Sequence, residues 1–163
     1  MLKWSLVVFM FFSSLVWAQN LYEKGNKYIG FEINRNPEIR GGYFWDDEVA
    51  FVGGIILNFN RQLEANGVRF RFGIDRYAPF NQLTSYWGGS LSVGINPVAY
   101  SGSNYKGTQI ILDGHWGLNL FIFNTLSLTG QVGLALQFDS PQKARTTLSF
   151  HTFSSGLMMH FFF

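Results

Sequence analysis

The sequence contains no cysteine, so no disulfide can hold the chain together. Its stability must come from a core, a metal ion or a ladder of backbone hydrogen bonds. Charged residues are also scarce, at 13% of the 163 residues, with 12 Lys and Arg against 10 Asp and Glu. This near balance of charge argues against a nucleic-acid partner. Few charges together with 18% aromatic residues exclude a disordered chain.

Beyond its first residues the sequence has no apolar run long enough for a membrane-spanning helix. Residues 1–18 have the features of a signal peptide. Lys3 provides the positive start, residues 6–16 are apolar apart from two serines, and Val16 and Ala18 place small residues at the cleavage site. We therefore predict a signal peptide over 1–18 and a mature domain over 19–163. A short membrane anchor is the alternative, but the run falls short of the roughly 20 residues that a spanning helix needs.

What the sequence does contain is aromatic residues and glycine, with 18 Phe, 7 Tyr and 5 Trp beside 18 Gly. The dominant pattern is alternation with a period of two, which places successive residues on opposite faces of a β-strand. In 126–138 the leucines alternate with Ser127, Thr129 and Gln131. Eight stretches follow this rule, the first hairpin around Asn36 and Pro37 least clearly. They are 28–34, 38–45, 48–60, 68–77, 86–96, 109–122, 126–138 and 147–163.

The two faces of these strands differ in a way that predicts their surroundings. One face carries large apolar residues and the other carries small polar ones. A soluble lipocalin-like barrel would turn its apolar residues inward, but eight strands leave an interior just wide enough for side chains. The apolar rows therefore fit better against lipid. We predict an all-β fold, a closed eight-stranded antiparallel transmembrane β-barrel with an up-and-down meander, monomeric and surrounded by outer-membrane lipid.

Three pieces of sequence resemble the small outer-membrane β-barrel family, the porin-like eight-stranded proteins of Gram-negative bacteria. Residues 42–51 resemble its strand–turn–strand with an aromatic pair. Residues 117–121 and 124–128, with Gly133, resemble its later periplasmic hairpin. The alternating C-terminal residues are similar to the signal read by the outer-membrane assembly machinery: Leu157, Met159, Phe161 and Phe163. The resemblance implies a fold, a bacterial outer-membrane location and an assembly partner, but no activity.

The polar faces predict a set of charged residues in the lumen. Three acids match three bases, and His115 shares a face with Asp113. We interpret this set as a buried ion-pair network that plugs the barrel, although desolvation offsets its Coulomb energy. A narrow path for ions or protons is the alternative. No cofactor is expected, and no second histidine lies at metal-ligand spacing from His115. The predicted set is Glu32, Arg40, Arg69, Arg71, Asp75, Asp113 and His115.

The last strand raises the question of catalysis. Its alternation predicts that His151 and Phe153 point outward to lipid, while His160 lies inside at the periplasmic end. Some eight-stranded barrels are lipid A deacylases with an outward His and Ser, and this region resembles them loosely. Ser154, however, falls on the opposite face, and no acidic residue follows His151 to orient it. A lipid-modifying enzyme is therefore the least favoured hypothesis.

Aromatic residues near strand ends are predicted to form interfacial girdles, and the external loops are short. Short loops offer little surface to a large extracellular partner. We therefore favour a structural or interaction barrel without catalysis. The predicted girdle residues are Trp45, Trp87, Trp116, Tyr28, Tyr43, Tyr86, Tyr100 and Tyr105, although Trp116 falls in the middle of its strand, where simple contact with lipid is the alternative.

Overall fold

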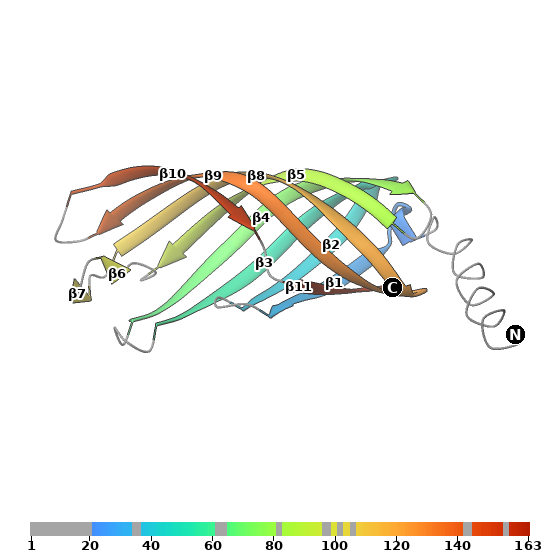
Figure 1. The fold of residues 1–163 in the computed structure, drawn as a ribbon, viewed down its shortest axis with the longest axis horizontal. Helices are drawn as coiled ribbons and strands as arrows, with labels where there is room; N and C mark the ends of the chain where they lie inside the picture. Colours follow the sequence, from blue (N-terminus) through green and yellow to red (C-terminus); the bar gives the residue numbers. More distant parts are fainter. Residues whose placement is uncertain are drawn as a thin grey trace, which may run out of the picture.

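The computed structural model describes residues 21–33, 37–60, 65–80, 83–95, 99–100, 103–104, 107–141, 145–154 and 157–163. Most of these residues lie in antiparallel β-strands (Figure 1). No helix in this part of the chain is long and apolar enough to cross a membrane. The strands are β1 (Lys27–Ile33), β2 (Glu38–Asp46), β3 (Val49–Asn60), β4 (Ala65–Phe80), β5 (Leu83–Ile95), β6 (Ala99–Tyr100), β7 (Ser103–Asn104), β8 (Gly107–Phe123), β9 (Leu126–Pro141), β10 (Thr147–Ser154) and β11 (Leu157–Phe162).

The long strands form one closed sheet in chain order. Both β10 and β11 pair with β9, at successive levels, so together they fill the eighth strand position. β11 also pairs with β1, which closes the ring. The strands β6 and β7 form a separate two-stranded sheet. The predicted closed eight-stranded antiparallel barrel with up-and-down order is confirmed.

The strand register fixes the stagger of the barrel, which is the shift along a strand after one full circuit of directly opposed residues. From Leu128 on β9, directly opposed residues lead through β11, β1, β2, β3, β4, β5 and β8 and return to β9 at Phe138, ten residues further along. A closed sheet with such a stagger must tilt its strands against the barrel axis. The tilt is visible in Figure 1.

The apolar faces point outward. Phe70 and Leu134 are 42% and 51% exposed, whereas Arg71 and Gln131 are 9% and 5% exposed. Along β8 the pattern of buried and exposed residues alternates almost without interruption. The predicted orientation, with apolar side chains outside and hydrophilic ones inside, is confirmed.

The interior is nevertheless not uniformly polar. At one end of the barrel, here called the turn end, short turns join β2 to β3 and β8 to β9, and the chain finishes at Phe163. Buried aromatic rings fill this end, and their members are Tyr22, Tyr28, Phe44, Tyr77, Tyr86, Phe121 and Phe162.

These rings correct part of the predicted girdle. Tyr28 and Tyr86 are inside the barrel, so the prediction that they face the surroundings is wrong. The other described girdle residues are on the outer surface at 45–50% exposure: Tyr43, Trp45, Trp87 and Trp116. The side chains of Tyr100 and Tyr105 lie outside the described residues.

Glycines on the inner face make room for inward rings. Tyr28 lies directly opposite Gly42, and Tyr86 lies opposite Gly117. A Cβ atom added at either glycine would overlap the tyrosine ring. His160 is placed over Gly30 in the same way. The alternation of single strands does not reveal these pairs, because each pair joins two strands.

The last strand position differs from the prediction of one strand over 147–163. In β10 the inner-face positions include His151 and Phe153, which lie opposite Ala135 and Gly133 of β9. In β11 the inner-face positions shift to the even numbers, such as His160. The prediction that His151 and Phe153 face lipid is therefore wrong, because the alternation does not continue across the break between β10 and β11.

Candidate functional site: the charged lumen

The centre of the lumen is built around Glu38, at the start of β2. Its Oε1 atom lies 3.0 Å from Nε of Arg40, and its Oε2 atom lies 3.0 Å from an Nη atom of Arg71 on β4. Arg71 also reaches toward Asp113 on β8, with an N–O distance of 3.9 Å. All four residues are buried. One carboxylate thus joins two guanidinium groups across the barrel interior.

His115 forms the second part of the centre. Its Nδ1 and Nε2 atoms each lie 2.9 Å from a carboxylate oxygen, of Asp113 and Asp75 respectively. The hydroxyl of Ser90 donates to the other oxygen of Asp113 at 2.6 Å. Because carboxylates only accept hydrogen bonds, a doubly protonated ring satisfies both contacts. With that charge, three bases match three acids. We call this set the lumen network: Glu38, Arg40, Arg71, Asp75, Asp113 and His115.

Small residues on neighbouring strands leave space for the lumen network. Gly88 lies opposite Asp75, and a Cβ atom there would overlap the Asp75 carboxylate and the backbone oxygen of Ile74. A Cβ atom at Gly54 would lie 2.7 Å from Oε1 of Glu38. The carboxylates therefore occupy volume that only glycine leaves free.

A second polar group lies nearer the other end of the barrel. Arg69 donates to the Gln109 side-chain oxygen at 3.2 Å, and the Gln109 amide donates to Asp139 at 2.8 Å. Gln137 donates to the other Asp139 oxygen at 2.7 Å. This group continues the polar interior beyond the lumen network.

The predicted lumen residues are brought together only in part. Arg40, Arg71, Asp75, Asp113 and His115 belong to the lumen network, whereas Arg69 belongs to the second polar group. Glu32 is half-buried on β1, directly opposite Glu38.

Glu38 itself was missed by sequence reasoning. The signal that could have identified it is its alternation with Arg40, two residues further along the same strand, which places both on one face.

The four residues of the predicted C-terminal signal lie on the outer face of β11 and at the chain end. Met159 and Phe161 lie opposite Leu128 and Leu126 of β9. Leu157 and Phe163 are 58% and 69% exposed. Their recognition by an assembly machinery stays a prediction.

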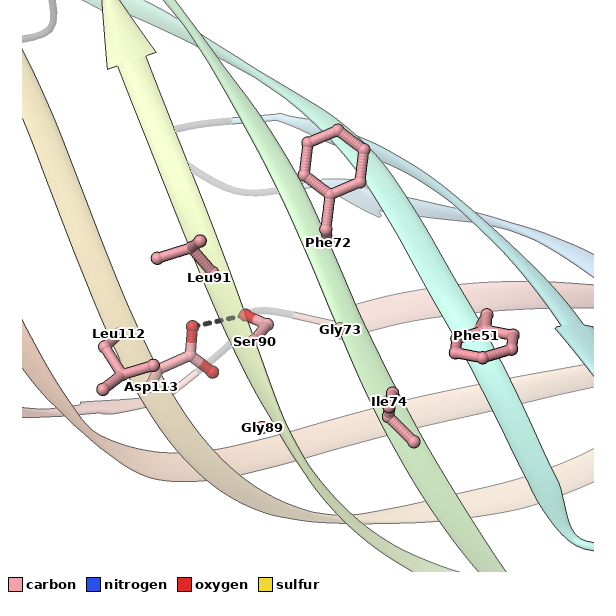
Figure 2. A pocket seen from close by; sticks show the side chains of 9 residues that line it. All are labelled: Phe51, Phe72, Gly73, Ile74, Gly89, Ser90, Leu91, Leu112 and Asp113. Carbon is pink, nitrogen blue, oxygen red and sulfur yellow. Dashed lines mark hydrogen bonds between the residues drawn. The ribbon is translucent and has the colours of Figure 1, made fainter.

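A depression of about 570 Å³ lies in the barrel wall (Figure 2). Exposed apolar residues surround it, among them Phe72 and Leu91, and Gly73 and Gly89 also line it. Ser90 and Asp113, which also border it, belong to the inner face and bond to each other. Its outer rim is formed by Phe51, Phe72, Ile74, Leu91 and Leu112. Such a surface suits acyl chains.

Neither histidine outside the lumen network is placed for metal binding. His160 is buried, with Nδ1 3.2 Å from the Thr129 hydroxyl, and His151 is half-buried on β10. Within the described ranges, no three His, Asp or Glu side chains are placed to hold one metal ion.

Comparison with solved structures places the fold. The chain is similar to the N-terminal β-barrel domain of Pseudomonas aeruginosa OprF, with a TM-score of 0.60 and 14% identity over 86% of this chain and 98% of that one. It is also similar to Neisserial surface protein A (NspA), with a TM-score of 0.46 and 14% identity over 83% and 92% of the two chains. No family model and no curated protein sequence matches the chain. The fold class is that of the small eight-stranded outer-membrane β-barrels.

Proposed function

We propose that this protein is a small integral barrel of the bacterial outer membrane with a structural or interaction role, whose lumen is plugged by charged side chains. The observation that carries the proposal is the lumen network, in which buried acids and bases neutralise one another across the interior. The apolar outer surface supports the membrane location, because exposed rows of Phe, Leu and Ile suit acyl chains. The turn end would face the periplasm, where such barrels have their short turns.

The geometry favours a plug over a wide pore. Eight strands leave room for little more than the inward side chains. Arg71 spans from Glu38 to Asp113 and so crosses this space. A buried ion whose partners are in contact has little tendency to leave them, because an unpaired charge in such an interior is costly.

A narrow ion path is the second candidate. It is favoured by the polar inner face of β9, which continues from one end of the barrel toward the other. Its buried polar residues are Ser127, Thr129, Gln131 and Asp139, and the apolar Ala135 lies between the last two.

Planar-bilayer recording on the purified, refolded protein separates the two candidates. We expect no stepwise currents from the parent protein, and we expect currents after Arg71→Ala, which removes the side chain that crosses the lumen. Arg76→Ala is the matched control, because Arg76 is exposed and lies 5.9 Å from the Trp87 ring on the outer surface. Stepwise currents from the parent that are lost in Arg71→Ala or Asp113→Ala would establish the channel and overturn the plug.

Biogenesis forms the remaining part of the proposal. Residues 1–18 would be removed on export, and the outward C-terminal residues would be read by the outer-membrane assembly machinery. We propose no catalytic step, since His151 belongs to the inner face of β10. N-terminal sequencing of the membrane-inserted protein is expected to begin at Gln19, and an intact leader would contradict this step.

A further inference from the structure

The segment Leu21–Asn26, which precedes β1, folds across the turn end of the barrel. Its backbone is held by the β2–β3 turn region: the Glu48 amide donates to the Tyr22 carbonyl at 2.8 Å, and the Gly25 amide donates to the Phe44 carbonyl at 2.7 Å. The Lys24 amide donates to the Asp47 carboxylate at 3.0 Å. This segment is therefore attached to the barrel by hydrogen bonds and forms no part of the sheet.

Tyr22 projects from this segment into the barrel. Its ring stacks on Tyr77 with 5.0 Å between centroids and meets Phe44, Phe121 and Phe162 edge-on at 5.6 to 6.1 Å. These four rings come from β2, β4, β8 and β11, which lie around the wall. A side chain that contacts all four must sit across the opening, and Tyr22 is only 2% exposed.

Behind this ring, five buried polar atoms form no well-aligned hydrogen bond with the described residues. The Tyr22 hydroxyl lies against the side chains of Thr84 and Asn119, which interact with it, and burial raises its pKa, so it remains neutral. The others lie on adjacent inner-face positions, since Thr84 is opposite Asn119 and Ser127 is opposite His160. The five atoms without a well-aligned bond are Tyr22 Oη, Thr84 Oγ1, Asn119 Nδ2, Ser127 Oγ and His160 Nε2.

We propose that the Tyr22 side chain blocks the lumen at the turn end, above a small hydrated chamber. We call Tyr22 in this role the stopper. Buried hydroxyl and amide groups without well-aligned protein partners are ordinarily satisfied by ordered water. The chamber is lined by hydroxyl, amide and imidazole groups, so the ligand it suits is water. The seal at this end belongs to the segment before β1, and displacing that segment gives water-soluble molecules a route into the lumen.

The absence of cysteine makes thiol labelling a direct test. Ser127→Cys places one thiol in the chamber, at a position of 0% exposure. A small, water-soluble methanethiosulfonate is added to the folded protein in detergent micelles. We expect labelling to accelerate at least about tenfold when Tyr22→Ala is added, because the thiol then becomes accessible. Tyr43→Ala, a tyrosine lost from the outer surface, is the matched control and should leave the rate unchanged.

Rapid labelling of Ser127→Cys with Tyr22 in place would overturn the proposal, and so would an unchanged rate in folded Tyr22→Ala. If Tyr22→Ala does not fold, Tyr22→Leu keeps apolar bulk and takes its place. Loss of folding in both would assign Tyr22 to the folding core and reject the stopper. A crystal structure is expected to show ordered water on Thr84 and Asn119, and a dry site would reject the chamber. Labelling reports access to one atom, so the result does not depend on whether the lumen conducts ions.

Discussion

Glu48 is the only described non-glycine residue with a left-handed backbone, at φ 65°. It lies in the turn between β2 and β3, where its amide bonds Tyr22 and its carbonyl accepts from the Tyr77 amide at 2.7 Å. These two bonds hold a conformation in which a side chain is strained.

Glu48→Gly should therefore stabilise the barrel, by about 1 kcal/mol, since glycine adopts this conformation without strain. The measurement is the urea midpoint of the barrel refolded in lipid vesicles. Thr125→Gly, in the other described turn and without a left-handed backbone, is the control and should give no gain. An equal gain from both variants would show that the backbone strain at Glu48 has no effect.

Substitution of Gly88 and of Gly53 by alanine compares a crowded glycine site with an open one. Gly88→Ala is expected to cost about 3 kcal/mol, because the new methyl group would overlap Asp75 and a backbone oxygen next to the lumen network. Gly53→Ala meets nothing within 4 Å and should stay within about 0.5 kcal/mol of the parent. Urea unfolding compares the two, and a similar stability for both would contradict the packing around Asp75.

Among single residues, sequence alternation identified the inward side chains but not their partners. Arg40, Arg71 and Asp113 were placed on the correct face. The predicted set includes Glu32 but not Glu38, which lies directly opposite Glu32 and pairs with Arg40 and Arg71. Alternation places both acids on the inner face and does not show that Arg71, on β4, reaches Glu38.

At the scale of elements, β10 differs from the other long strands. It pairs with β9 along eight residues, and no other described strand pairs with it. β11, which shares the same strand position, pairs with both β9 and β1. The ring is therefore closed by β11, and β10 has one free edge in the part of the chain that the structure describes.

We expect backbone amides of β10 to exchange with deuterium roughly tenfold faster than those of β11, because one-sided pairing lowers the cost of local opening. Native-state hydrogen exchange on the folded protein measures both strands in one experiment, so β11 serves as the internal control. Equal protection of the two strands would show that a second partner covers the edge of β10.

For the whole molecule, the closed sheet and the apolar surface predict behaviour in detergent. Unfolding the closed sheet requires many backbone N–H and C=O groups to lose their hydrogen-bond partners in a place where detergent tails offer no replacement. The unheated protein should therefore resist dodecyl sulfate and change its gel mobility after boiling. A sample kept in urea and never transferred to micelles is the control and should migrate like the boiled one. A single mobility for all samples, together with recovery in the soluble fraction, would contradict the membrane barrel.

Alternation predicts the eight strand positions of the barrel and the outward side of most of them, because it is a property of each strand alone. Which side chains meet inside depends on how the strands pack against one another. The ten-residue stagger places Glu38 beside Arg71 and sets Tyr28 over Gly42. The last strand position is divided into β10 and β11 with His151 on the inner face, and Tyr22 fills the turn end. These outcomes depend on contacts between strands, and a periodicity within one strand carries no information about its neighbour.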